Sequence, residues 1–330
     1  MDTAVRIRGV NAQQRFVIDD ESKVGEARRA AQALASFDLT AEIAGQVAIA
    51  ATELSRNLLR HARGGELLVQ QLDDGEHTTV ELLAIDRGPG MGDVAACMVD
   101  GYSTAGTPGT GLGAVRRLAD EFDIHSAPGQ GTIVLARFGD LLPTRFGAVC
   151  VPVEGEFECG DSWHLEHRGD EVALFVVDGL GHGTFAAEAA RAAVLAFEVA
   201  PFDPPQDVMT RANERMTKTR GGAAACARLS GNLVSYSGVG NIAGTLVAHE
   251  KSLGLVSHNG TLGANPRRAQ QFEYTREPGS LLVMHTDGIS ARWDLRHRPD
   301  VLVMHPAIIA GMLYRDHARG RDDATVVVIA

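Results

Sequence analysis

Apolar residues recur at helical spacing over residues 40–62, which predicts a helix there, and a further helix is expected just before it at 23–37. Short runs of strand-forming residues bounded by Gly and Asp surround these helices. The other elements expected in this half are strands at 15–18, 66–72, 78–86 and 132–138 and a short helix at 113–122. This order indicates an α+β unit in which helices lie on one face of a mixed sheet.

The second half of the chain is richer in strands. Apolar runs predict strands at 172–178, 223–229, 233–238, 244–248, 281–285 and 325–330, and two helices at 184–200 and 205–219. A layered sandwich of sheets flanked by helices fits this pattern. Turn residues from Gly139 to Pro143 separate the halves, so we predict domains at 1–139 and 140–330.

Composition agrees with two globular domains. The chain has 330 residues, of which 45% are hydrophobic and 22% charged, which is typical of folded proteins. The net charge of -11 argues against general binding to nucleic acid or to an anionic membrane. No apolar run approaches the roughly 18 residues of a membrane span, and residues 1–10 lack the apolar core of a secretion signal. The four cysteines have no CxxC spacing and are interpreted as reduced thiols of a cytoplasmic protein.

The second predicted helix carries three polar residues at intervals of four, Glu53, Asn57 and His61, which therefore share one helical face. An amide oxygen can ligate Mg²⁺, and a carboxylate one turn earlier can accept a proton. Taken alone, the same spacing is also typical of a solvated stripe on an amphipathic helix.

Two glycine-rich segments follow this helix. Asp86 ends an apolar strand and precedes Gly88 and Gly90. A carboxylate there can accept a hydrogen bond from an exocyclic amine, while glycines let the backbone approach a ligand. Residues 109–113 immediately precede a predicted helix, whose free amides favour phosphate. Either segment alone is also compatible with an ordinary loop.

Taken together and in order, these segments resemble the GHKL ATPase family. Residues 51–62 resemble its N box, 86–92 its G1 box and 109–113 its G2 box. The tail at 117–126 with 129–132 is similar to switch-protein serine kinases of the RsbT type and to related anti-sigma factors. The resemblance spans about 10–138 and implies a GHKL (Bergerat) α/β sandwich that binds ATP with Mg²⁺.

The resemblance also implies roles for individual residues. Asn57 would hold Mg²⁺, Glu53 would act as general base, and Asp86 would recognise adenine by a hydrogen bond. Gly88 and Gly90 would shape the pocket, Gly109, Thr110, Gly111, Leu112 and Gly113 would close over the phosphates, and Thr132 would support the adenine end. Such kinases phosphorylate Ser or Thr on a STAS-domain protein. A sensor histidine kinase is disfavoured, since no histidine precedes Glu53.

Four acidic clusters in the second half each lie at the edge of an apolar run. Their key carboxylates are Asp161, Asp178, Asp287 and Asp322. Strand ends that gather like charges are costly unless cations neutralise them. Hard oxygen ligands suit Mg²⁺ or Mn²⁺, and a pair of such ions can activate water for phosphoryl hydrolysis. Any one Asp-Gly pair, in contrast, is typical of a turn.

In this order the clusters resemble the PPM metal-dependent protein phosphatases, and the SpoIIE/RsbX-like branch in particular, over about residues 145–330. The resemblance implies an α-β-β-α sandwich in which Asp178 bridges both metals and the Gly179 carbonyl ligates one. Asp287 would hold the first metal, Asp322 rather than Asp323 would be the terminal ligand, and Asp161 matches an early acidic position. Residues 238–241 would form a turn near the site. His182 would be a loop residue or would donate to phosphate. Neither Arg145 nor Arg168 can be chosen as a phosphate-binding arginine.

We therefore expect a bifunctional switch. The first domain would phosphorylate a Ser or Thr of a STAS-domain antagonist or stressosome-like component, and the second would remove phosphate from a phosphoserine or phosphothreonine protein. Two alternatives stay open. One is a phosphatase whose ATP domain only senses nucleotide or binds a partner, and the other is an anti-sigma-type binding module with a vestigial phosphatase. Intact Glu53 and intact Asp178, Asp287 and Asp322 favour the switch.

Overall fold

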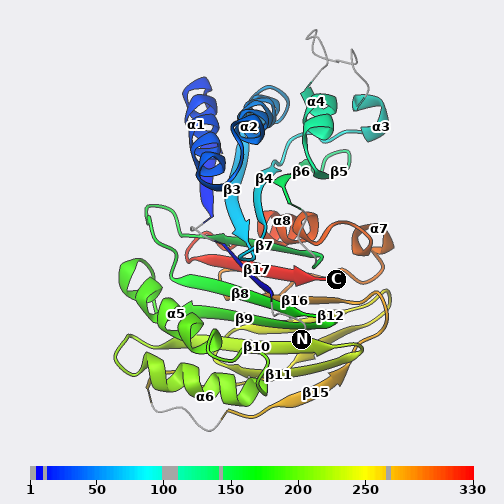
Figure 1. Cartoon of the computed structure of the whole chain (residues 1–330). Helices are drawn as coiled ribbons and strands as arrows, with labels where there is room; N and C mark the ends of the chain where they lie inside the picture. Colours follow the sequence, from blue (N-terminus) through cyan, green and yellow to red (C-terminus); the bar gives the residue numbers. More distant parts are fainter. Residues whose placement is uncertain (1–4, 10–12, 99–110, 141–143, 265–268) are drawn as a thin grey trace. The chain divides into compact units, whose positions relative to one another are not determined.

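The structure is a computed structural model that describes residues 5–9, 13–98, 111–140, 144–264 and 269–330. The chain divides into two compact units, residues 9–143 and residues 1–8 with 144–330 (Figure 1). The first residues join the second unit because β1 (Val5–Gly9) pairs antiparallel with β8 (Asp161–Arg168). The predicted boundary at 139/140 stays a proposal. None of the described helices is long and apolar enough to cross a membrane.

The sheet of the first unit has the strand order β2-β3-β4-β6-β5. Its strands are β2 (Gln14–Ile18), β3 (Gly65–Asp73), β4 (Thr78–Ile85), β5 (Glu121–Ser126) and β6 (Thr132–Gly139). Each of these pairs among the described residues is antiparallel. These four pairs therefore give no support to the predicted mixed sheet. The tight hairpins β3–β4 and β5–β6 impose antiparallel pairing on neighbouring strands.

Helices α1 (Glu21–Asp38) and α2 (Ala41–His61) pack on this sheet near their predicted positions. Each begins at a capping side chain. Asp20 accepts a hydrogen bond from the Ser22 amide, and Thr40 Oγ1 accepts one from the Ile43 amide. Buried apolar residues from both helices share one core with alternate residues of β3, β4 and β6. Because the apolar face of α2 is buried in this core, the orientation of the helix is fixed, and so are the positions of Glu53 and Asn57.

Helix α4 (Gly111–Leu118) is shorter than the helix predicted at 113–122. The last two residues of the predicted helix, 121 and 122, belong to β5 instead, because Phe122 and Ile124 alternate as in a strand and both pack against the core. A further short helix, α3 (Val94–Cys97), begins at Asp93.

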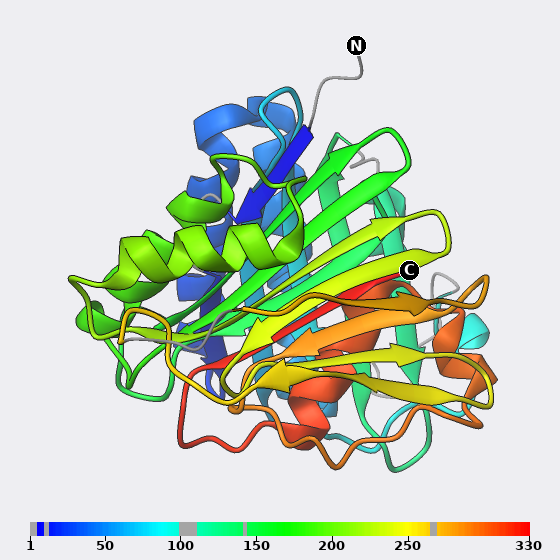
Figure 2. The same cartoon turned by 90° about the horizontal axis from the view of Figure 1, so that it is seen from below.

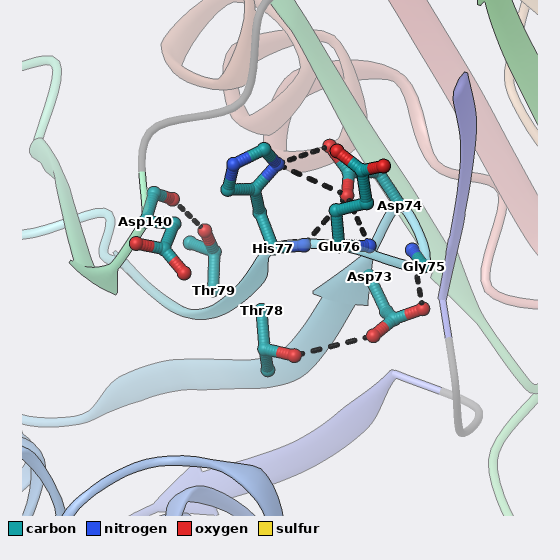
Figure 3. A network of polar contacts seen from close by, with 8 residues as sticks. All are labelled: Asp73, Asp74, Gly75, Glu76, His77, Thr78, Thr79 and Asp140. Carbon is teal, nitrogen blue, oxygen red and sulfur yellow. Dashed lines mark hydrogen bonds and ion pairs between the residues drawn. The ribbon is translucent and has the colours of Figure 1, made fainter. Parts of the chain in front are cut away.

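The turn between β3 and β4 is held by its own carboxylates (Figure 3). Asp74 Oδ1 accepts hydrogen bonds from the Glu76 and His77 amides at 2.9 and 2.7 Å, and its carboxylate also contacts the His77 ring. Although burial opposes it, these hydrogen bonds hold the pKa of Asp74 below its usual value. The Asp74 carboxylate raises the pKa of His77. The cluster is a closed turn, since every carboxylate oxygen drawn for Asp73 and Asp74 accepts a bond from the turn itself.

The second unit contains two sheets. In one, β1, β8, β9 (Glu171–Gly179), β10 (Gly222–Ser230) and β11 (Leu233–Val239) are neighbours in that order, and β14 (Ser257–His258) and β15 (Phe272–Thr275) both pair with β11. The other has the order β13-β12-β16-β17-β7, with bounds Ser252–Leu255, Ala243–Val247, Leu281–His285, Ala324–Ile329 and Phe146–Val151. Helices α5 (Thr184–Phe197) and α6 (Pro205–Met216) cover the first sheet (Figure 2).

Helix α8 (Pro306–His317) packs on β7 and β17 of the second sheet, and the short α7 (Pro299–Leu302) precedes it. Sequence reasoning missed α8, β7 and β8, and also the shorter elements β1, β13, β14, β15 and α7. Ten consecutive residues of α8, from Pro306 to Arg315, are buried, so its sequence has no polar face to reveal a helical period. The resulting order of helices, sheet, sheet and helices is the α-β-β-α sandwich expected from the resemblance.

Candidate functional site

The first candidate site lies where α2 meets the start of α4. A Cβ atom built on Gly111 would stand 3.3 Å from Glu53 Oε2 and 3.5 Å from both amide atoms of Asn57. The structure therefore brings the polar residues of α2 and the glycine-rich helix start together, as the sequence predicted. His61 is exposed at the last residue of α2. Gly109 and Thr110 lie outside the described residues.

Asn57 has the environment of a ligand-binding side chain. Its Nδ2 atom is buried and has no hydrogen-bond partner among the described residues. A buried amide without a partner costs free energy, so such a group usually serves a ligand or a water. Glu53, one turn earlier, has a side chain that is 31% exposed, with its Oε1 4.0 Å from Arg56 Nη1. The pair places a carboxylate and an amide beside Gly111, the first residue of α4.

Asp86 directly follows β4 and is held by hydrogen bonds to two backbone amides. Its Oδ1 accepts hydrogen bonds from the Gly88 amide at 2.7 Å and the Thr132 amide at 3.1 Å. The Asp86 amide in turn donates to the Thr132 carbonyl at 2.9 Å. Gly131 makes this geometry possible, because its φ is +75° and a Cβ there would collide with the Asp86 carbonyl oxygen. The strand-end carboxylate is thus fixed in one orientation.

Ser126 is a member of this site to which the sequence analysis gave no role. Its Oγ accepts a hydrogen bond from the Met91 amide at 2.8 Å and lies 2.9 Å from Thr132 Oγ1. It thereby ties the segment after Asp86 to β6. No sequence signal distinguishes this serine, since it depends on the register of β5 against β6. Of the other predicted residues, Leu112 packs against the core and Gly113 is buried.

The second candidate site is formed by acidic residues at strand ends of the second unit. Asp161 and Asp178 are direct partners in the antiparallel pair β8–β9. Burial, and then the negative charge of Asp178, raise the pKa of Asp161 well above its usual value. Asp161 Oδ2 accepts a hydrogen bond from Thr286 Oγ1 at 2.7 Å. This bond joins Asp161 on the first sheet to the residue that directly precedes Asp287.

Asp178 is the electrostatic centre of the cluster. Burial raises its pKa to about 7, and the charges of Asp287, Asp322 and Asp323 add to the effect. The Asn241 side chain opposes this shift and also donates from Nδ2 to Asp287 Oδ2 at 2.7 Å. The prediction of a turn at 238–241 was wrong for its first half, because Gly238 and Val239 belong to β11; Asn241 lies just after this strand, and its side-chain amide holds Asp287.

Asp322 and Asp323 differ in what they contact. Asp323 accepts hydrogen bonds from the Val153 amide at 2.7 Å and the Gly160 amide at 2.6 Å, so both of its carboxylate oxygens bind the loop before β8. Asp322 Oδ1 accepts from the Asp323 amide at 3.0 Å. Gly288 allows the segment that carries Asp322 and Asp323 to pack closely against it, since a Cβ at Gly288 would collide with the Asp323 carbonyl oxygen. Asp322 therefore accepts fewer of these hydrogen bonds than Asp323 does, and its charge acts on Asp178.

Gly179 and His182 occupy the loop that leads from β9 into α5. A Cβ at Gly179 would collide with the Ala186 carbonyl oxygen, so only glycine fits. The His182 ring Nδ1 lies 2.7 Å from Glu156 Oε1. Arg168 is paired with Glu171 at 2.5 Å. This ion pair occupies the guanidinium of Arg168.

The chemistry of these donors fits a hard divalent cation. Burial raises the pKa of Asp161, Asp178 and Asp323, and neighbouring carboxylates add to each shift, so a bound cation would offset this unfavourable negative charge. Among the described residues, however, no three His, Cys, Asp or Glu side chains already enclose a common point at ligand distance. The carboxylates agree with the expected ligands in type and in neighbourhood, and their assignment as ligands stays a prediction.

Known protein families match the two units of the chain separately. Residues 17–138 match the "Histidine kinase-like ATPase domain" family, and residues 168–330 match the "Stage II sporulation protein E (SpoIIE)" family. A curated relative, "Serine/threonine-protein kinase RsbT" of Bacillus subtilis (strain 168), is 38% identical over 91 residues, which is 28% of this chain and 68% of the relative. "Phosphoserine phosphatase RsbX" of the same strain is 29% identical over 142 residues, 42% of this chain and 70% of RsbX.

A solved structure described as "The bacterial stressosome: a modular system that has been adapted to control secondary messenger signaling" is also similar. It has a TM-score of 0.53 and 25% identity, and the match covers 57% of this chain and all of that chain. Fold and sites together define an ATP-binding domain joined to a metal-dependent phosphatase domain. The chain belongs to the histidine kinase-like ATPase family through its first unit and to the SpoIIE family of PPM phosphatases through its second.

Proposed function

We propose that this protein is a bifunctional regulator of a partner-switching pathway. Its first domain transfers the γ-phosphoryl group of ATP to a Ser or Thr of a STAS-domain antagonist or stressosome-like component. Its second domain removes phosphate from a phosphoserine or phosphothreonine protein. The observation that carries the proposal is the pairing, in one chain, of an ATP-type site around Asn57 and Asp86 with a carboxylate cluster around Asp178.

In the phosphotransfer site, the Asn57 side-chain oxygen, which lies beside Gly111 at the start of α4, would ligate the Mg²⁺ that accompanies ATP. Asp86, held by Gly88 and Thr132, would accept a hydrogen bond from the exocyclic amine of adenine. The start of α4 at Gly111 offers free amides to the phosphates. Glu53 would accept the proton of the attacking hydroxyl, and catalysis would otherwise rest on positioning and charge neutralisation.

In the hydrolytic site, Asp178, the Gly179 carbonyl, Asp287 and Asp322 would hold Mg²⁺ or Mn²⁺, with Asp161 as a further acidic member. When bound, these ions supply an activated water and neutralise the phosphoryl oxygens. Asn241 orients Asp287, Thr286 orients Asp161, and Asp323 braces the loop that leads into β8. Such outer contacts orient ligands and tune affinity.

The alternative with a specific basis is a phosphatase whose ATP domain binds nucleotide or a partner without transferring phosphate. Similarity to RsbT covers only 28% of this chain, and Glu53 is the residue on which transfer depends. A binding domain would keep the Asn57 and Asp86 contacts and have no need of Glu53. Measuring phosphotransfer with the Glu53→Gln protein alongside ATP affinity separates the two functions.

The phosphatase assignment is tested by phosphate release from a phosphorylated STAS-domain protein. We expect release with Mn²⁺ or Mg²⁺ and none in the presence of a chelator. Release that a chelator leaves unchanged would contradict the proposed metal centre. Release from small phosphomonoesters but from no phosphoprotein would contradict the proposed substrate class.

A further inference from the structure

Two cysteines lie in contact beside the proposed metal centre. Cys150 Sγ is 3.7 Å from Cys159 Sγ and 3.7 Å from the Asp161 carbonyl oxygen. Cys150 is on β7 of one sheet, and Cys159 is on the loop that enters β8 of the other. Cys150 is partly exposed and Cys159 is buried. The pair therefore links the two sheets at the end where the acidic residues gather.

We propose that Cys150 and Cys159 form a thiol modification site, which a peroxide converts to a disulfide that lowers the affinity of the metal centre. This inference rests on the metal centre proposed above. A disulfide joins its sulfur atoms at about 2.05 Å, so the two must approach by roughly 1.7 Å. Neither cysteine is part of a disulfide in the structure.

The chemistry balances with a peroxide as the oxidant. The sulfur of Cys150, the residue of the pair that is partly exposed, attacks one peroxide oxygen, the O–O bond breaks, and water leaves. Cys150 is then a sulfenic acid. The Cys159 sulfur attacks the Cys150 sulfur, the S–S bond forms, and the sulfenic oxygen leaves as a second water. The two thiols lose two electrons and two protons, and hydrogen peroxide becomes two waters.

The movement reaches the carboxylates through Gly160, the residue after Cys159. The Gly160 amide donates to Asp323 at 2.6 Å. Gly160 is also tightly packed, since a Cβ there would stand 2.6 Å from Ala186 Cβ and 2.8 Å from Asp323 Oδ2. A loop with so little room transmits a displacement of Cys159 to Asp323, which neighbours Asp322. Because outer contacts of this kind change metal affinity by about 10–100-fold, we expect weaker binding of Mn²⁺ in the disulfide form.

The test uses the full chain with Cys97→Ser, which removes a partly exposed thiol of the other unit. The protein is treated with hydrogen peroxide, its remaining thiols are alkylated, and peptide mapping by mass spectrometry identifies the cross-link. Thermal unfolding against Mn²⁺ concentration then reports metal affinity with no substrate. We expect a Cys150–Cys159 cross-link and a half-maximal Mn²⁺ concentration raised about tenfold. A dithiol reductant should remove the cross-link and restore the original Mn²⁺ response.

Cys150→Ser in the same background is the control, and it should show neither the cross-link nor the shift. Cys159→Ala is a second control in case the first variant unfolds. Absence of the cross-link in the peroxide-treated protein overturns the inference, and so does a cross-link that leaves the Mn²⁺ response unchanged. If Mn²⁺ fails to stabilise even the reduced protein, the metal centre itself is contradicted, which is a distinct result.

Discussion

Asp161 lies directly opposite Asp178 in the β8–β9 pair, so two carboxylates share one end of a sheet. Side chains of directly opposed residues project to the same face, and like charges in that position repel. The structure adds Asp287 and Asp322 to the same neighbourhood, and the pKa of Asp178 rises to about 7 through burial and these charges. Repulsion between these carboxylates destabilises the folded chain, and bound cations would offset that repulsion. The arrangement is therefore typical of a cation-binding site.

The first prediction concerns Asp178→Asn. This change should reduce Mn²⁺-dependent phosphate release by roughly 10²–10³-fold, the loss typical of removing one central electrostatic group. The measurement is initial rate against Mn²⁺ concentration. Asp294→Asn is the matched control, because it neutralises a carboxylate that is paired with Arg296 on an exposed turn. Equal rates for the Asp178→Asn and unchanged proteins would remove Asp178 from the metal centre.

The second prediction concerns pH and metal together. The pKa of Asp178 in the folded chain, about 7, lies above the value of 3.8 for the unfolded chain. The folded state therefore binds more protons between these values, and the stability of the metal-free protein should fall as pH rises from 4 towards 7. Mn²⁺ replaces the lost protons, so its stabilising effect on thermal unfolding should be larger at about pH 8 than at about pH 6. An effect of equal size at both pH values would contradict this reading of Asp178.

The third prediction compares two glycines of one loop. Gly129 and Gly131 both have φ near +75°, so alanine strains the backbone equally at either position. A Cβ at Gly131 would collide with the Asp86 carbonyl oxygen, whereas one at Gly129 meets nothing within 4 Å. Gly131→Ala should weaken ATP binding at least about tenfold more than Gly129→Ala, as measured by calorimetric titration. Equal losses would show that backbone strain alone matters.

The fourth prediction concerns Glu53→Gln. The amide keeps the shape of the side chain but accepts a proton poorly, so phosphotransfer should fall by about 10²–10⁴-fold. ATP affinity should stay within about twofold of the original, because Asn57 and Asp86 are untouched. Asn57→Ala provides the opposite pattern, with loss of Mg²⁺-dependent ATP binding. Full transfer by the Glu53→Gln protein would exclude Glu53 as the base.

Both candidate sites could be proposed from the sequence because their residues lie in short contiguous segments, such as Asp86 to Gly92 and Asp178 to Gly183. The sequence could not predict residues whose role depends on strand register. Asn241 meets Asp287, Thr286 meets Asp161, and Ser126 meets Thr132 only through the folded arrangement. Helix α8 was missed for a different reason, since a segment that is buried all round loses the polar face that reveals a helix.

The measurement that tests the central claim most directly is the intact mass of a candidate STAS-domain partner incubated with this protein. ATP and Mg²⁺ are added first, and ATP is then exchanged for Mn²⁺. The account predicts a gain of one phosphate in the first step and its loss in the second. A partner already phosphorylated that loses phosphate, with no gain in the first step, would contradict the kinase half. A partner that gains phosphate and retains it in Mn²⁺ would contradict the phosphatase half.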